Sequence, residues 1–239
     1  MDFLNQYLIT NKIDKIESVK DYPLIKRIYI SGECKYVLKY LPYEFDRLIW
    51  LEEVYKSLSN YDFQISKPKI NIQGRYISER NNLKFVLFDC YKNPKSTFYS
   101  AEWWSKIMVN IHDMDINAKY PRILDLSNCT GLLEKAFFYM DFQTRKTLDK
   151  YFSNDILNSI DFSEKKFNHA DLLLSNVLKY HGKNVLIDFE NCCIAPKEFD
   201  IQRHLCDYMV HSDNYNEIVR YFKQFLMLYE YQGAKINDE

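Results

Sequence analysis

The stretch from residue 168 to residue 190, NHADLLLSNVLKYHGKNVLIDFE, constrains the fold of this chain more than any other segment. It places His169, Asp171 and Asn176 in the order H-x-D-x-x-x-x-N, and an apolar run then ends on Asp188. The runs VLKY and NVLID, separated by the polar turn HGKN, have the pattern of a β-hairpin. Such a hairpin brings two carboxylates and one amide together at the ends of adjacent strands.

Phosphoryl transfer from a nucleotide requires this set of side chains. One carboxylate orients the attacking hydroxyl or accepts its proton, and two oxygen ligands hold Mg²⁺. The spacing assigns the first role to Asp171 and the metal-ligand role to Asn176 and Asp188. There are simpler interpretations, since Asp171 before three leucines also suits a helix N-cap and Asp188 could merely end a strand. Taken together, the residues favour a kinase that acts on a small molecule.

A lysine in the strand-like run KYVLKYL (35–41) adds a further component of such a site. The alternation of a strand places Lys39 on the same face as Val37, where a charged side chain needs an explanation. Pairing with nucleotide phosphates and with a helix glutamate provides one. Glu52 and Glu53, on the next predicted helix, are the two candidates for that glutamate. The alternative is a solvated lysine on an edge strand.

Two other polar residues, His169 and Asp200, are candidates for supporting the site, and a third, His112, has a purely structural interpretation. His169 lies two residues before Asp171, where hydrogen bonds from its ring to the backbone would brace the loop. His112 lies at the end of a predicted helix, and we expect it to cap or pack there. Asp200, in FDIQRHL, either caps a helix or holds the catalytic loop in place.

The first part of the chain is rich in strand-like runs. The expected elements are a short helix over 1–12, strands over 15–20, 24–30 and 35–41, a helix over 45–58, and strands over 74–78 and 84–89. The sequence KNPK at 92–95 then breaks the pattern, and we predict a lobe boundary there.

The second part is rich in helix-like periodicity. The expected elements are a helix over 100–114, a mostly helical stretch over 117–168, the hairpin, and helices over 199–210 and 215–231. The order predicts an α+β fold with two lobes. A strand-rich lobe (1–92) would bind a nucleotide, and a mainly helical lobe (93–239) would carry the catalytic and acceptor-binding residues.

Charge and cysteine content narrow the function classes. The net charge is −1, with about +3 on residues 1–92 and about −4 on residues 93–239. A nucleic-acid role therefore has no electrostatic support, and the acidic half would suit a cationic acceptor unless the surface charge is scattered at random. The six cysteines form no C-x-x-C pair and no zinc-ligand spacing, which predicts reduced thiols in a cytoplasmic protein. No secretory signal and no apolar run of membrane-spanning length is evident.

Six motifs together resemble the aminoglycoside phosphotransferase and choline kinase-like superfamily, whose members share the two-lobed protein-kinase fold. YVLKY resembles the strand with the phosphate-binding lysine, FVLFDCY the strand that leads into the hinge, and IMVNIHDMD a large-lobe helix. NHADLLLSNVL resembles the catalytic H-G-D-x-x-x-x-N signature, VLIDFE the metal-binding segment, and FDIQRHL the helix after it. The likeness extends over most of the chain.

This resemblance implies a role for each matching residue. Asp171 is then the catalytic base or hydroxyl orienter, Asn176 and Asp188 are Mg²⁺ ligands, and Lys39 contacts the phosphates of ATP. Backbone groups of the predicted hinge would bind the adenine; these belong to Phe88, Asp89, Cys90 and Tyr91. The chain departs from the family in three respects, with Ala170 in place of glycine, no glycine in the predicted phosphate-covering turn at 19–23, and a short overall length.

The expected activity is transfer of the γ-phosphoryl group of ATP or GTP to a hydroxyl of a small molecule. The acceptor would be an aminoglycoside, another hydroxylated antibiotic, choline or an amino-sugar-like metabolite, and antibiotic resistance would follow for the first two. One alternative is a kinase-like, nucleotide-binding protein without catalysis, for which the glycine-free turn argues. Another is a metal-dependent hydrolase that uses the same carboxylates, which would need more nearby His or Asp ligands.

Overall fold

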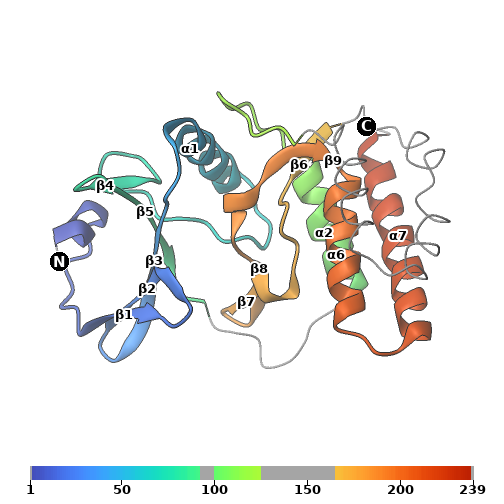
Figure 1. Cartoon of the computed structure of the whole chain (residues 1–239), viewed down its shortest axis with the longest axis horizontal. Coiled ribbons are helices and arrows are strands. Elements are labelled where there is room, and N and C mark those ends of the chain that lie inside the picture. The colour runs from blue at the N-terminus through green and yellow to red at the C-terminus, as the bar shows by residue number, and fades with distance from the viewer. Residues whose placement is uncertain (1, 92–99, 125–164, 238–239) are drawn as a thin grey trace, which may run out of the picture.

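The computed structural model describes residues 2–91, 100–124 and 165–237 (Figure 1). Within these ranges, an antiparallel sheet with one long helix lies at the N-terminal end, and helices predominate at the other end. Two short hairpin-like strand pairs occupy the middle. This arrangement confirms the predicted α+β class with a strand-rich first part and a mainly helical second part.

The N-terminal sheet has five strands in the order β1-β2-β3-β5-β4, and all neighbours are antiparallel. The strands are β1 (Lys15–Val19), β2 (Tyr22–Ile30), β3 (Glu33–Tyr40), β4 (Ser78–Arg80) and β5 (Leu83–Asp89). Two of the turns, Ser31–Gly32 and Asn81–Asn82, have positive φ at both central residues. That conformation matches the right-handed twist of strands and favours Gly and Asn, so the local sequence sets the hairpin register.

The two faces of β3 have different environments, as the alternation in the sequence predicted. Leu38 is buried in a small apolar cluster with Leu4 from the 3₁₀ helix η1 (Asp2–Tyr7), which covers the outer face of the sheet. Lys39, the next residue, lies on the opposite face and reaches toward the second half of the chain. Burial of the apolar face therefore fixes the direction in which the lysine points.

Helix α1 (Phe45–Asn60) follows β3 and packs into the main hydrophobic core. Trp50, Leu51 and Val54 are fully buried there, in one cluster with residues from the second half of the chain. The segment after α1 then pairs with β8 (Lys183–Leu186) through Ser66 and Gln64, whose hydrogen bonds to Leu186 measure 2.7 and 2.9 Å. A shared core and a backbone pairing thus join the two halves of the molecule.

The described part of the C-terminal half contains three helices, α2 (Ala101–His112), α6 (Glu198–Val210) and α7 (Tyr215–Asn237), seen side by side in Figure 1. Helix α7 buries Tyr221, Phe225 and Tyr229, which recur every four residues and so lie on one face. His112 of α2 is hydrogen-bonded to the Tyr229 hydroxyl at 2.7 Å. The predicted helix-end position of this histidine is therefore a packed contact between helices.

Short strands connect these helices to the site. They are β6 (Lys165–Asn168) paired with β9 (Cys193–Pro196), and β7 (Val177–Tyr180) paired with β8. The 3₁₀ turns η2 (Leu174–Asn176) and η3 (Phe189–Asn191) precede β7 and follow β8. The predicted hairpin is confirmed, with a two-residue turn at His181–Gly182, both residues having positive φ.

Several sequence-based boundaries need correction. Residues 117–124, expected to be helical, form no helix, and Lys165–Asn168 is a strand because it pairs with β9. The rest of that stretch, like the predicted lobe boundary at 92–95, lies outside the described residues. The strand expected over 74–78 begins only at Ser78. Among the described helices, none is both long enough and apolar enough to cross a bilayer.

Candidate active site

The loop between β6 and β7 carries Asp171 and Asn176. The side-chain amide nitrogen of Asn176 donates to the Asp171 carboxylate Oδ2 and to the Asp171 carbonyl, both at 2.9 Å. With its amide hydrogens directed at Asp171, Asn176 presents its amide oxygen as the atom that could bind a metal ion. Asp171 and Asn176, which lie five positions apart in the sequence, are therefore in direct contact.

His169 connects this loop to the strand that leads to Asp188. Its ring is buried, with Nδ1 accepting a hydrogen bond from the Asp171 N–H at 3.2 Å. The other ring nitrogen, Nε2, therefore carries the proton and donates to the Ile187 carbonyl at 2.9 Å. Burial lowers the pKa of His169, which keeps the ring neutral in this arrangement. The geometry suits a bracing role and leaves no free ring nitrogen for proton transfer.

Asp200 holds the start of the same loop. It is fully buried in the first turn of α6, and its carboxylate accepts from the backbone N–H groups of His169 and Ala170, both at 2.7 Å. Of the two roles that the sequence left open, the geometry supports loop anchoring. Ala170 has a φ of +66°, a conformation that costs a residue with a Cβ about 1–2 kcal/mol and that explains the glycine usual in the resembling family. The two charge-assisted hydrogen bonds that Asp200 accepts help to offset that cost.

One face of α6 contacts the catalytic loop at three points. Besides Asp200, Arg203 places Nη2 3.1 Å from Asp171 Oδ1, and Asp207 accepts from the Leu174 N–H at 2.8 Å. Residues 200, 203 and 207 recur at helical spacing, so they lie in one row along the helix. Sequence reasoning missed Arg203 and Asp207, although the D-x-x-R-x-x-x-D spacing was the signal that could have revealed them.

Asp188 lies just beyond β8 in a left-handed backbone conformation, with φ 72° and ψ 57°. Such a conformation is uncommon for a residue with a side chain and is typical of functional loops. Its carboxylate, with the side chain 30% exposed, accepts from Lys39 Nζ at 2.7 Å. Burial alone would raise the pKa of Asp188, but the hydrogen bond with Glu190 and the Lys39 charge outweigh it and lower the pKa to about 2. The carboxylate is therefore ionised and available as a metal ligand.

Lys39 has a second partner that the sequence analysis did not predict. Its Nζ lies 2.9 Å from Glu190 Oε2, and the Glu190 side chain is only 2% exposed. Burial would lower the pKa of Lys39, but the charges of Glu190 and Asp188 outweigh it and raise the pKa well above its usual value. One ammonium group thus faces two carboxyl groups from the same loop, and burial together with the hydrogen bond to Asp188 raises the pKa of Glu190 to about 7.

The expectation that Glu52 or Glu53 pairs with Lys39 is wrong. The Glu52 carboxylate accepts from the backbone N–H groups of Tyr76 and Ile77 at 2.8 and 2.7 Å, because it lies beside a loop whose amides need acceptors. Glu53 lies near the surface, 3.8 Å from Lys56. Neither glutamate therefore serves as the cofactor-site partner that the sequence analysis proposed.

The side chains of this region fit a divalent cation that takes some ligands from the protein and the others from a bound nucleotide. The Ile187 N–H donates to the Asn176 carbonyl at 2.9 Å, which ties the segment of Asp188 to that of Asn176. Within the described ranges, no three His, Cys, Asp or Glu side chains form a closed metal cage. Mg²⁺ commonly binds through one or two protein oxygens and completes its shell with phosphates and water. Asn176 and Asp188 would supply the protein oxygens.

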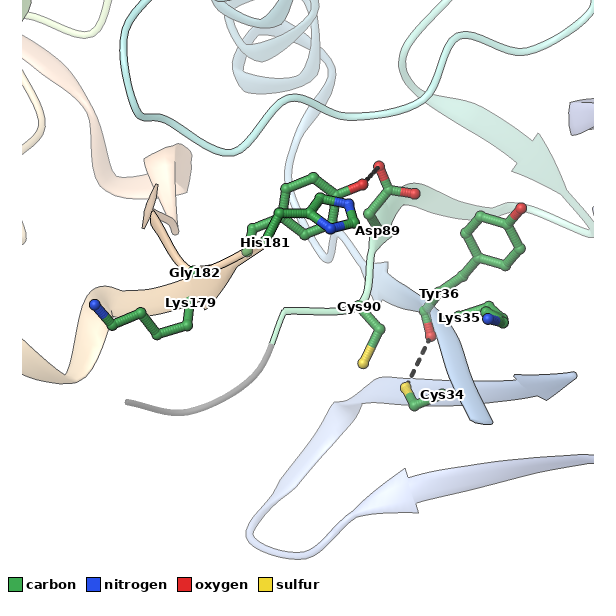
Figure 2. A pocket seen from close by; sticks show the side chains of 9 residues that line it. Cys34, Lys35, Tyr36, Asp89, Cys90, Lys179, His181 and Gly182 are labelled. Atoms are coloured by element: carbon green, nitrogen blue, oxygen red, sulfur yellow. Dashed lines mark hydrogen bonds between the residues drawn. The ribbon is translucent and has the colours of Figure 1, made fainter. Parts of the chain in front are cut away.

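A cavity of about 430 Å³ lies beside the predicted hinge (Figure 2). Its lining residues are Cys34, Lys35, Tyr36, Asp89, Cys90, Lys179, Tyr180, His181 and Gly182. The Tyr180 hydroxyl is bonded to Asp89 at 3.3 Å, and the Cys90 N–H donates to the Lys35 carbonyl at 2.9 Å. Asp89 and Cys90 line this cavity, whereas Lys39, Asp171 and Asp188 do not. The residues that line this cavity are therefore different from those that form the carboxylate centre.

The cysteines in the described part of the chain form no disulfide bond. Those in the described part of the chain, Cys34, Cys90, Cys192, Cys193 and Cys206, are all free thiols. Cys192 and Cys193 are adjacent and buried, and burial raises the pKa of each thiol. They pack in the interior rather than forming a disulfide, in agreement with the predicted reduced thiols.

Neither a protein-family model nor a curated protein matches this sequence. Solved structures do match. An amicoumacin kinase determined with AMP-PNP, Ca²⁺ and Ami is 16% identical, with a TM-score of 0.65, and the match covers 92% of this chain and 73% of that one. Wild-type aminoglycoside 2'-phosphotransferase-IIIa in its GDP complex is 15% identical, with a TM-score of 0.62 and coverages of 99% and 91%.

An aminoglycoside phosphotransferase from Alicyclobacillus acidocaldarius is also similar. It is 12% identical, with a TM-score of 0.65 and coverages of 94% of this chain and 76% of that one. At such low identity the shared property is the fold. The chain therefore has the two-lobed fold of the aminoglycoside phosphotransferases, which confirms the fold inferred from the motif resemblance.

The buried His204 on α6 generates a prediction about pH. Burial lowers the pKa of this histidine to about 3, and its Nε2 contacts the Tyr221 hydroxyl at 2.7 Å. The pKa of His204 is lower in the folded state than in the unfolded state. The neutral ring therefore makes its full contribution to the free energy of unfolding above about pH 6.5, and this contribution is lost as the pH falls toward 3. Within that window, each unit by which the pH falls should lower the free energy of unfolding by about 1.4 kcal/mol through His204.

Urea denaturation of wild type and of His204→Gln at several pH values between 7 and 5 tests this. The glutamine does not titrate and can still bond to Tyr221. We expect the unfolding free energy of wild type to decrease steadily relative to that of His204→Gln as the pH falls. Parallel pH profiles would show that His204 is not the titrating group.

Proposed function

We propose that this protein is a phosphotransferase that moves the γ-phosphoryl group of ATP or GTP to a hydroxyl of a small molecule. The observation that carries the proposal is the convergence of two polar groups from different halves of the chain. Lys39 from the N-terminal sheet meets Asp188 at 2.7 Å, and the Asp171–Asn176 pair lies on the adjoining loop. The shared fold with known small-molecule kinases supports it.

Each group has a role that its environment suits. Asp171, held by Asn176 and Arg203, would orient the acceptor hydroxyl and receive its proton. Lys39 would contact the phosphates of the nucleotide. Mg²⁺ held by Asn176 and Asp188 would neutralise charge on the phosphate oxygens when bound. Catalysis of this kind is mostly positioning and electrostatic stabilisation, so no covalent intermediate on the protein is needed.

The nucleotide would lie between the N-terminal lobe (1–92) and the rest of the chain. Backbone groups of Phe88, Asp89, Cys90 and Tyr91 would bind the base. The Lys20–Asp21 turn between β1 and β2 would cover the phosphates, with Asp21 at a φ of +67° providing the left-handed turn residue that glycine usually supplies. Similar structures hold AMP-PNP or GDP, so both ATP and GTP remain candidate donors.

The acceptor would be a small hydroxylated molecule. Similar structures include a complex of streptomycin and ATP and a complex of spectinomycin and ADP. The acidic residues of 93–239 would favour a cationic acceptor, in keeping with the charge distribution. Arg203, whose side chain is 48% exposed beside Asp171, adds a positive charge near the reacting hydroxyl. An acceptor amine would therefore lie away from Asp171.

Transfer assays test the proposed function. With labelled ATP, Mg²⁺ and a panel of hydroxylated amines, wild type should phosphorylate at least one acceptor. Asp171→Ala should reduce turnover by about 10²- to 10⁴-fold, the usual contribution of general base catalysis, and should bind ATP as wild type does. Asp213→Ala removes an exposed aspartate and should leave turnover unchanged. Equal turnover in wild type and Asp171→Ala would remove the assigned base.

Arg203 generates a second prediction. Because it holds one oxygen of the Asp171 carboxylate, Arg203→Gln should lower kcat by about 10- to 100-fold through loss of orientation. The dissociation constant of ATP should not change, since Arg203 contacts Asp171 and not the residues assigned to the nucleotide. Arg220→Gln, an exposed arginine on α7, is the matched control. An unchanged kcat in Arg203→Gln would show that the contact is not used in turnover.

A further inference from the structure

The more deeply buried of the two carboxyl groups that contact Lys39 belongs to Glu190, in the loop after β8. Glu190 lies in η3, two residues after Asp188, and is nearly fully buried. Its Oε2 is 2.9 Å from Lys39 Nζ, and its Oε1 accepts from the Tyr55 hydroxyl at 3.0 Å. Both carboxylate oxygens therefore have a defined donor. A buried carboxyl group bound in this way has little freedom to reorient.

Helix α1 docks onto this loop with hydrogen-bond donors. Arg47 donates to the Glu190 carbonyl, and both Arg47 and Trp50 donate to the Cys192 carbonyl, at 3.1 and 3.4 Å. Tyr55 adds the bond to the Glu190 carboxylate. The helix face beside Lys39 thus supplies donors while the loop supplies the acceptors.

We propose that Glu190 is the positioning residue that aims Lys39 at the nucleotide phosphates. It takes the task for which a helix glutamate was expected. This inference rests on the proposed function. Asp188 is the more exposed of the two carboxylates that contact Lys39, and it is the one assigned to the metal ion. Glu190 is buried, so it remains bound to Lys39 whichever partner Asp188 takes.

The arrangement links the position of α1 to that of the lysine. Tyr55 bridges α1 to Glu190, and Glu190 bridges to Lys39 on β3. A displacement of α1 would therefore release the glutamate and, through it, the lysine. The Tyr55 hydroxyl should accordingly contribute to nucleotide affinity although it has no predicted contact with the nucleotide.

The test compares AMP-PNP with adenosine as probes, both in the presence of Mg²⁺, by calorimetric titration of the full chain. Lys39 acts on phosphates, so Glu190→Gln should raise the dissociation constant of AMP-PNP about 10-fold and leave that of adenosine unchanged. Glu53→Gln, a surface glutamate on α1, should change neither. In a Lys39→Met background, Glu190→Gln should cause no additional loss, because the group that it positions is gone.

Three results would overturn the inference. The first is that Glu190→Gln binds AMP-PNP as wild type does while Glu52→Gln or Glu53→Gln binds it more weakly. That result would show that a glutamate of α1 positions Lys39. The second is an equal loss for AMP-PNP and adenosine, which would show a merely structural role. The third is a further loss in the Lys39→Met background. Wild type that binds neither probe would refute the proposed function itself.

A second variant keeps the test decisive if Glu190→Gln does not fold, as judged by circular dichroism. Tyr55→Phe retains the buried carboxylate and removes only the hydroxyl that holds it. We expect about a 2- to 5-fold weaker affinity for AMP-PNP, in line with loss of one ordinary hydrogen bond, and unchanged affinity for adenosine. Unchanged affinity for AMP-PNP in Tyr55→Phe would contradict the proposed link from α1 to Lys39.

Discussion

The contact of Lys39 with Asp188 and Glu190 is the interaction on which the rest of the site depends. It joins the N-terminal sheet to the loop after β8, at 2.7 and 2.9 Å. One positive charge facing two carboxylates is a costly arrangement for a protein interior, and a hydrophobic replacement is often as stable. Under the proposed function its value lies in catalysis, because a partly exposed carboxylate beside a fixed ammonium group would bind a nucleotide together with its metal ion.

Helix α6 supplies the second constraint. Asp200, Arg203 and Asp207 lie along one face and bind the catalytic loop at three successive points. The loop itself consists of a short irregular segment with Ala170 in a left-handed conformation, so it has little intrinsic preference for its shape. The rigid helix thus determines where the Asp171 carboxylate points, and sites built on rigid elements are positioned more accurately than sites on loops alone.

Much of the fold and the proximity of the main candidate residues could be predicted from the sequence, because both follow from local patterns. Alternation placed Lys39 opposite Leu38, and the hairpin run placed Asp188 near Asn176. Pairing choices could not be predicted. Glu52 is nearer to Lys39 in the chain than Glu190 is, but it is occupied by the amides of Tyr76 and Ile77. The strands β6 and β9 were missed because each is short and is stabilised only by its distant partner.

Thermal unfolding of wild type and Asp188→Ala, with and without ATP and Mg²⁺, tests the central claim most directly. A ligand that binds only the folded state stabilises it, by about 2.7 kcal/mol at 100 times its dissociation constant. We predict that ATP with Mg²⁺ raises the Tm of wild type and that the rise largely disappears in Asp188→Ala. A wild-type Tm that does not respond to ATP with Mg²⁺, or an equal rise in Asp188→Ala, would contradict a nucleotide site built on Lys39 and Asp188.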